Sequence, residues 1–153
     1  MYKKVLVPLD GSELAECALI HVKSLTKDGS IGEVILFRVV VDELPLFDTD
    51  GVIMPNFDYE AWRKSLLEEA QKYLGDAQSR LAAEGIKTEL TIREGNRPAQ
   101  IITDFAQKNG IDLIILATHG YTGMKKLMFG SVALSVLQDA AVPVLLIRPE
   151  ACR

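Results

Sequence analysis

The chain has 153 residues, of which 48% are hydrophobic and 25% are charged, a composition typical of one globular domain with a sizeable core. Its formal net charge of −4 at pH 7 argues against a nucleic-acid partner, because nucleic-acid-binding proteins normally present a basic face. No apolar run reaches the roughly 18 residues of a membrane span, no signal peptide is recognised, and Cys17 and Cys152 are expected to be free thiols, so we expect a cytoplasmic protein with no membrane partner.

Short apolar runs predict five strands, and apolar residues at helical spacing predict four helices between them. The expected strands cover residues 5–9, 34–40, 87–92, 112–116 and 142–147. The expected helices cover residues 13–25, 59–83, 98–109 and 132–140. Residues 42–57 contain acidic residues, prolines and a glycine. We expect them to form a long loop that is mobile without ligand and less mobile when ligand is bound.

This alternation predicts an α/β fold, a five-stranded parallel sheet with helices on both faces. Ligands of such sheets bind beyond the carboxyl ends of the strands, where the strand order reverses. The periodicity leaves two strand orders open, 2-1-3-4-5 and 3-2-1-4-5. Only the second order places the first strand beside the fourth, and it would bring Asp10 next to Ala117.

The connection between the fourth strand and the last helix is the most informative segment. It contains three glycines and two lysines, and no acidic residue occurs between Asp112 and Asp139. Backbone N–H groups in a glycine-containing strand-to-helix connection can gather around an anion, and Gly130 would let the backbone approach closely. A plain connection, with glycines for turns and Ser131 as the helix N-cap, explains the same residues. The segment therefore favours a phosphate site without requiring one.

Asp10 is the second candidate, at the end of the first strand. Its carboxylate could accept hydrogen bonds from ribose hydroxyls, or it could cap the helix that follows. Asp10 and Glu13 already supply negative charge at that helix N-terminus, so phosphates are expected at the other connection.

Several well-defined binding and catalytic motifs are absent from the sequence. It contains no P-loop, no dinucleotide-binding glycine fingerprint, no Cys/His zinc cluster and no nucleophile elbow. His119 could contact phosphate or simply be a solvated loop residue, and no residue stands out as a positioned general base. We therefore expect no catalytic residue and no metal site built by the protein alone.

Three stretches resemble universal stress protein domains. Residues 7–13, Val-Pro-Leu-Asp-Gly-Ser-Glu, are similar to the opening of these domains, and residues 140–147 resemble their final strand. Residues 118–131 are similar to their nucleotide signature, which is Gly, two residues, Gly, nine residues, Gly, then Ser or Thr; Ala117 stands where the first glycine is usual. The resemblance covers the whole chain and implies a single domain over residues 1–153, strand order 3-2-1-4-5 and, commonly, a homodimer.

The resemblance also implies a function, a stress-linked sensor or accessory protein that binds ATP or another adenine nucleotide. ATP would carry Mg²⁺ or Mn²⁺, for which Ser131 is a candidate ligand. A slow ATPase and a nucleotide-free interaction protein remain as alternatives, the latter because of Ala117. The implied nucleotide contacts are Pro8, Leu9, Asp10, Val39, Ala117, Thr118, His119, Gly120, Gly130, Ser131 and Val132.

A homodimer is expected to form through the final strand, between Val142 and Ile147. This stretch is apolar on both faces and can lie at the sheet edge. Pairing with a second copy would cover an edge that otherwise invites aggregation.

Overall fold

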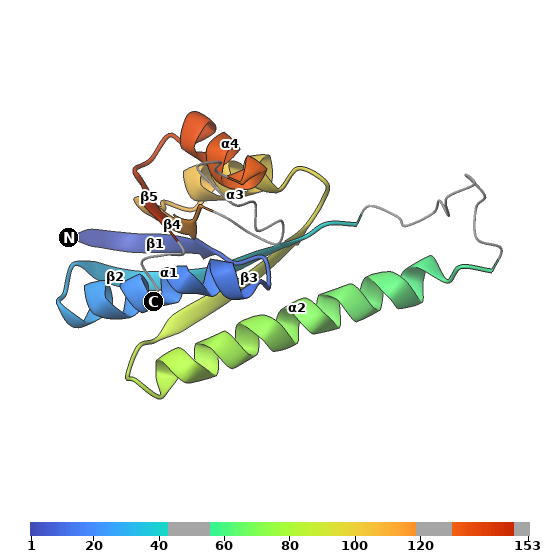
Figure 1. Cartoon of the computed structure of the whole chain (residues 1–153), viewed down its shortest axis with the longest axis horizontal. Coiled ribbons are helices and arrows are strands. Elements are labelled where there is room, and N and C mark those ends of the chain that lie inside the picture. The colour runs from blue at the N-terminus through green and yellow to red at the C-terminus, as the bar shows by residue number, and fades with distance from the viewer. Residues whose placement is uncertain (43–55, 119–129, 149–153) are drawn as a thin grey trace.

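The computed structural model describes residues 1–42, 56–118 and 130–148, and it shows one sheet with helices on either side (Figure 1). The strands are β1 (Tyr2–Pro8), β2 (Ile31–Val40), β3 (Thr88–Glu94), β4 (Leu113–Ala117) and β5 (Val144–Ile147). The helices are α1 (Glu13–Lys27), α2 (Tyr59–Ala82), α3 (Pro98–Lys108) and α4 (Ser131–Asp139).

All strand pairs are parallel and the order is β3-β2-β1-β4-β5, which confirms the predicted fold class and order. The pairing of β1 with β4 sets Val5 opposite Leu113 and Leu6 opposite Ile114. Since successive strands run the same way, every strand ends at one edge of the sheet, and β1 and β4 end side by side there.

The last strand is shorter than predicted, four residues instead of six. Pro143 lacks an N–H and cannot donate to a ladder, although its carbonyl oxygen accepts a hydrogen bond from the Ile114 N–H at 3.0 Å. The ladder of β5 therefore begins only after the proline. The predicted loop at 42–57 falls largely on residues 43–55, outside the described residues.

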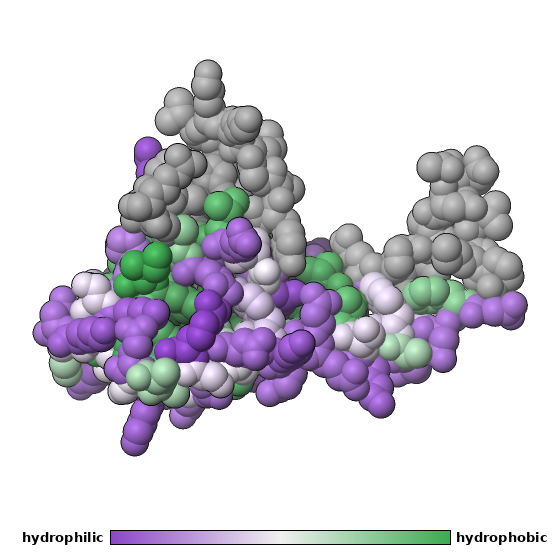
Figure 2. Space-filling view, turned by 60° about the horizontal axis from the view of Figure 1, so that its bottom comes forward, coloured by the Kyte–Doolittle hydropathy of each residue, from purple (hydrophilic) through white to green (hydrophobic). Residues whose placement is uncertain are grey.

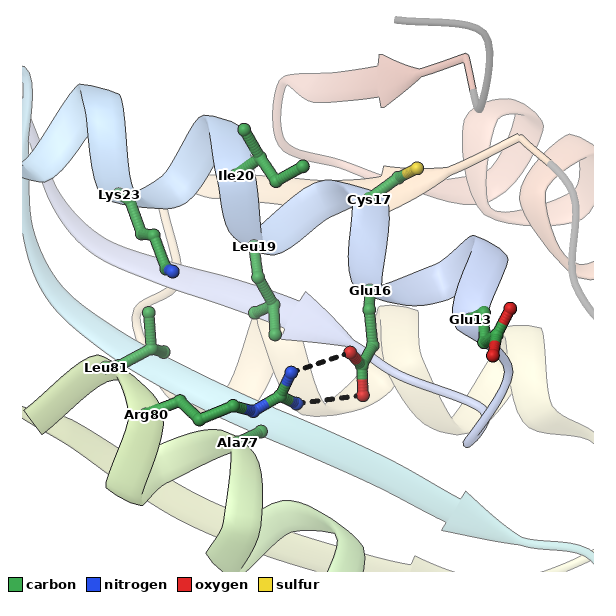
Figure 3. A pocket seen from close by; sticks show the side chains of 9 residues that line it. All are labelled: Glu13, Glu16, Cys17, Leu19, Ile20, Lys23, Ala77, Arg80 and Leu81. Atoms are coloured by element: carbon green, nitrogen blue, oxygen red, sulfur yellow. Dashed lines mark hydrogen bonds and ion pairs between the residues drawn. The ribbon is translucent and has the colours of Figure 1, made fainter. Parts of the chain in front are cut away.

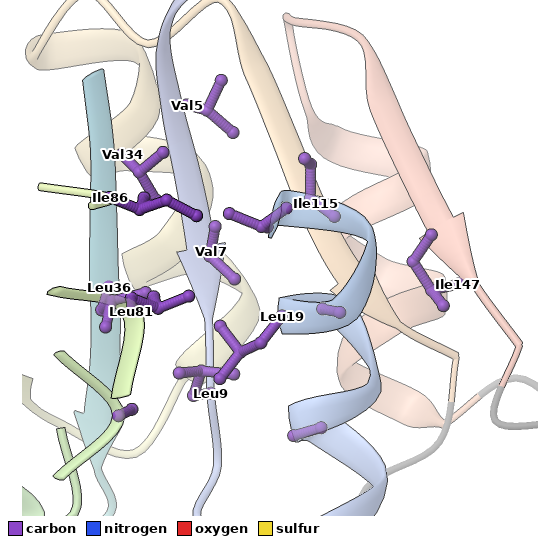
Figure 4. Close-up of a cluster of buried hydrophobic side chains, with 14 of the residues drawn as sticks. Val5, Val7, Leu9, Leu19, Val34, Leu36, Leu81, Ile86, Ile115 and Ile147 are labelled. Carbon is purple, nitrogen blue, oxygen red and sulfur yellow. The ribbon is translucent and has the colours of Figure 1, made fainter. Parts of the chain in front are cut away.

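Two hydrophobic clusters lie on opposite faces of the sheet, because side chains alternate along each strand. Val5 and Val7 face α1 and α2, in a cluster that also holds Ile115 and Ile147 (Figure 4). Leu6 faces the other way, toward α3 and α4. The strands are thus covered on both faces, as a parallel sheet requires.

Helix α1 begins at a tight turn directly after β1. Ser12 is its N-cap, and the Ser12 Oγ accepts a hydrogen bond from the Ala15 N–H at 3.1 Å. Gly11 has φ +87°, a backbone conformation that side chains disfavour, so the turn needs glycine. The turn places Asp10 at the edge where the strands end.

Cys17, on α1, is disulfide-bonded in the structure, so the expectation of a free thiol at this position is wrong. Sequence separation does not reveal which cysteines meet in a folded chain, since only their spatial approach decides it. Cys152 lies outside the described residues. Among the described helices, none has the length and apolar character to cross a membrane.

We expect Ile115→Ala to destabilise the protein by about 2–5 kcal/mol. Ile115 is fully buried on the interior strand β4, and the surrounding side chains cannot collapse into the space it leaves. Urea unfolding followed by circular dichroism measures the change. The control is Ile20→Ala, since Ile20 is 51% exposed and its truncation should cost no more than about 0.5 kcal/mol. Equal effects of the two substitutions would contradict the assigned core.

Glu84 is expected to make the stability of the protein depend on pH. Its hydrogen bonds with Lys23 (2.5 Å) and Lys27 (2.9 Å) lower its pKa from 4.5 to about 2. A lowered pKa in the folded state means that the contribution to stability is present above about pH 4.5 and is lost as the pH falls toward 2. Glu84→Gln should therefore lower the Tm at pH 6 and leave it unchanged near pH 2.

The matched control is Glu68→Gln. The carboxylate of Glu68 is 69% exposed and lies 3.9 Å from Lys64, so we expect a smaller effect at pH 6. A Glu84→Gln effect that is independent of pH would show that these ion pairs do not carry it.

Candidate functional site

A cavity of about 270 Å³ opens where β1, β2 and β4 end and where α3 and α4 begin. Strand β1 lies between β2 and β4, so this is the point at which the strand order reverses. Nine of the predicted contact residues line it, namely Pro8, Leu9, Asp10, Val39, Ala117, Thr118, Gly130, Ser131 and Val132. The other two, His119 and Gly120, lie outside the described residues.

One side of the cavity is apolar. It includes Phe37 and Val39 of β2, Leu116 of β4 and Ile102 of α3. The Phe37 ring is fully buried and lies 4.7 Å, centroid to centroid, from the ring of Phe105, which makes this wall rigid.

Sequence reasoning missed seven lining residues, namely Ala15, Phe37, Val41, Pro98, Ile102, Leu116 and Ala133. A signal for two of them was present, because Phe37, Val39 and Val41 are two residues apart on the same strand direction and so share a face. Pro98 and Ile102 could not be found this way. They belong to a helix whose placement over the strand ends is a tertiary property.

The carboxylate of Asp10 supports the turn that starts α1. Its Oδ1 accepts hydrogen bonds from the Ser12 N–H at 2.9 Å and from the Ser12 hydroxyl at 2.5 Å. Asp10 does not itself cap α1; it holds Ser12, which is the N-cap. Within the described part of the chain no donor reaches Oδ2, so one carboxylate oxygen is left for another partner.

The N-terminus of α4 supplies the opposite side of the cavity. Gly130 is the N-cap and no side chain caps this helix, so the alternative in which Ser131 is the N-cap is wrong. Ser131 and Val132 are the first helical residues, and the N–H groups of a first helical turn have no partner within their own helix. Both residues line the cavity.

Gly130 has φ −56°, which any residue can adopt. Its N–H donates to the Thr118 carbonyl oxygen at 2.6 Å, so the two ends of the undescribed connection lie against each other. A functional need for glycine at this position would therefore come from close approach of a ligand to the backbone, not from backbone strain.

The charges also distinguish the two helix N-termini at the site. The first turn of α1 carries Glu13 and Glu16, whereas the first turn of α4 carries no acidic residue. An anion is stabilised at a helix N-terminus by the helix dipole, and neighbouring carboxylates would oppose it. Of the two, α4 is the favourable anion position.

A second hollow, of about 330 Å³, is a groove between α1 and α2 (Figure 3). Arg80 donates two hydrogen bonds of 2.9 Å to the carboxylate of Glu16 across it. Its lining residues do not include any predicted contact residue, and its Arg80 and Glu16 side chains already pair with each other. The cavity at the strand ends is the better candidate site.

The model of the universal stress protein family matches residues 1–148. Universal stress protein MJ0577 of Methanocaldococcus jannaschii is 35% identical, covering 97% of this chain and 96% of its own. Universal stress protein YxiE of Bacillus subtilis is 32% identical, covering 97% of this chain and 100% of its own. The chain belongs to the universal stress protein family.

Solved structures agree with the observed fold. A structure of MJ0577 superposes with a TM-score of 0.79 at 34% identity, over 97% of this chain and 96% of that one. A universal stress family protein of Arabidopsis thaliana, described with AMP bound, has a TM-score of 0.66 at 16% identity, over 95% and 91% of the two chains. A universal stress protein described in complex with cAMP has a TM-score of 0.60 at 18% identity, over 97% and 98%.

Proposed function

We propose that this protein binds ATP or another adenine nucleotide in the cavity at the strand ends and acts as a stress-linked sensor or accessory protein. The observation that carries the proposal is the combination of three features in one cavity: an apolar wall, one carboxylate with a free oxygen, and an uncapped helix N-terminus. Two proteins of the same fold are described with AMP and cAMP, which agrees with an adenine ligand.

The three features match the three parts of a nucleotide. The apolar wall around Val39 suits the adenine ring, whose faces are apolar and whose edge can meet strand backbone. Oδ2 of Asp10 can accept hydrogen bonds from ribose hydroxyls, while Oδ1 keeps the turn in place. Ser131 and Val132 line the cavity, and N–H groups at a helix N-terminus suit phosphate oxygens.

A divalent cation would accompany a bound triphosphate. The described residues contain no group of three or more His, Cys, Asp or Glu side chains placed to hold a metal. Mg²⁺ or Mn²⁺ would therefore be held mainly by phosphate oxygens and water, with the Ser131 hydroxyl as the candidate protein ligand.

Gly130→Val is expected to abolish binding of Mg-ATP while leaving the protein folded. A β-branched side chain would hold the ligand away from the backbone at the start of α4, but the observed φ of −56° accommodates it. Isothermal titration calorimetry measures the affinity and circular dichroism the fold. The control is Gly75→Val, since an added Cβ at Gly75 meets nothing within 4 Å.

Two further variants measure how much Ser131 and Ala117 contribute to the affinity for Mg-ATP. Ser131→Ala should weaken binding by roughly ten- to a hundredfold, the worth of one hydrogen bond to a charged group. Ala117→Gly should leave binding unchanged or improve it, because the methyl group of Ala117 borders the proposed ribose position. If Gly130→Val folds and binds Mg-ATP like the parent, the phosphate position is wrong and the nucleotide-free alternative becomes the better one.

We further propose a homodimer formed through β5. Strand β5 is at the end of the sheet order, and the described surface is largely hydrophilic in the view of Figure 2. Three leucines nevertheless stay exposed on α4 and β5, Leu134 at 40%, Leu137 at 44% and Leu145 at 36%. A second copy pairing along β5 would cover both the open strand edge and these side chains.

Light scattering should give twice the chain mass of 16.9 kDa at micromolar concentrations. Leu145→Lys should shift this value toward the monomer, since it places a charge in the apolar contact. Ile20→Lys is the control, because Ile20 is exposed on α1, away from β5. A monomeric mass for the parent chain would overturn the dimer.

A further inference from the structure

Arg38 is a charged residue that neither the sequence motifs nor the cavity lining explains. It follows Leu36 by two residues on β2, and Leu36 belongs to the cluster beneath α1 and α2. Val39, between Arg38 and the strand end, points to the opposite face and lines the cavity. Arg38 therefore lies beneath the site, on the far side of the sheet from the proposed ligand.

The guanidinium group of Arg38 packs directly against the turn that carries Asp10. A Cβ placed on Gly11 would overlap Nη1 of Arg38, and it would lie 3.1 Å from Cζ and 3.2 Å from Nη2. Gly11 thus leaves room for the guanidinium group in addition to adopting φ +87°. The neighbours of Gly11 are Asp10 and Ser12, which hydrogen-bond to each other across it.

Tyr73 of α2 holds Arg38 from the other side. The guanidinium carbon lies 5.4 Å from the centre of the Tyr73 ring, a cation–π distance. Nε of Arg38 is buried and has no hydrogen-bond partner among the described residues. The guanidinium group thus has two described neighbours, the Tyr73 ring and the Gly11 turn.

The surrounding charges indicate that Asp10 is the carboxylate on which the charge of Arg38 acts. Burial, and then the negative charges of Glu16 and Asp10, raise the pKa of Tyr73, so both carboxylates reach this neighbourhood. Glu16 is already paired with Arg80 through two hydrogen bonds of 2.9 Å. Asp10 has no such cationic partner in the described chain, and Arg38 lies directly behind its turn.

We propose that Arg38 is a positioning residue for Asp10. Clamped by Tyr73, its guanidinium group fixes the Gly11 turn from below and keeps the Asp10 carboxylate aimed into the cavity, toward the ribose. This inference rests on the proposed nucleotide function and adds a residue that never touches the ligand. It also connects α2 to the binding site, through Tyr73.

The test compares two ligands that differ only at the ribose, Mg-ATP and its 2′,3′-dideoxy analogue. Arg38→Met keeps an unbranched apolar stem and removes the guanidinium group. We expect it to weaken Mg-ATP by about tenfold and the dideoxy analogue by less than about twofold, since only ATP offers hydroxyls to Asp10. Arg63→Met is the matched control, because Arg63 pairs with Glu94 on the surface, and it should change neither affinity.

Equal weakening of both ligands would show a merely structural role and would overturn the proposal, as would no weakening at all. Tyr73→Phe keeps the aromatic face and should bind like the parent, whereas Tyr73→Leu should reproduce the ribose-dependent loss of Arg38→Met. If Arg38→Met fails to fold, Arg38→Lys and the Tyr73 pair carry the same comparison. A parent chain that binds no nucleotide would instead overturn the proposed function itself.

Discussion

The pairing of β1 with β4 is the constraint on which the rest of this structure depends. It sets β1 between a strand that follows it in the chain and one that comes much later. The connections from β1 and β4 must then leave toward opposite faces of the sheet, α1 on one side and α4 on the other. Within the part of the chain that the structure describes, no helix lies across the strand ends between α1 and α4, and the cavity occupies that space.

The polar groups that the cavity presents depend on how α1 and α4 begin. α1 is capped by Ser12, supported by Asp10, and its first turn is acidic. Among the described residues, α4 is capped by a glycine with no side-chain cap, and its first turn contains no acidic residue. One helix start thus presents a carboxylate oxygen and the other presents donors, so a single cavity has a position for hydroxyls and a position for anions.

Beneath this cavity, the opposite face of the sheet is not a uniform apolar core. Near the strand ends, the row of β2 side chains that starts with Val34 and Leu36 continues with Arg38. The cation is tolerated because the Tyr73 ring and the open side of Gly11 enclose it, and carboxylates lie nearby. Leu9 and Ala15 belong to the cluster under α1 and α2 and also line the cavity, so the two sides of the sheet meet near this turn.

Local signals were sufficient for much of this structure. The alternating pattern of strands and helices, the turn at residues 10–12 and the glycine-containing connection before α4 all follow from short stretches of sequence, since propensity, capping and side-chain period act over a few residues. The resemblance to universal stress protein domains, in contrast, implied the nine predicted residues that line the cavity. Local signals misjudged the start of β5, where a proline cannot join the ladder. The alternative in which Ser131 is the N-cap of α4 is also wrong, because Gly130 is the N-cap.

Other features exist only in the folded chain. Periodicity left the strand order open, because each strand would bury the same face in either order; the resemblance to a family supplied the answer and the observed pairing agrees with it. The disulfide of Cys17, the contribution of Pro98 and Ile102 to the cavity, and the position of Arg38 between Gly11 and Tyr73 could not be anticipated. Each of these features brings together residues that are distant in the chain. Tertiary packing creates such contacts, and short stretches of sequence do not encode them.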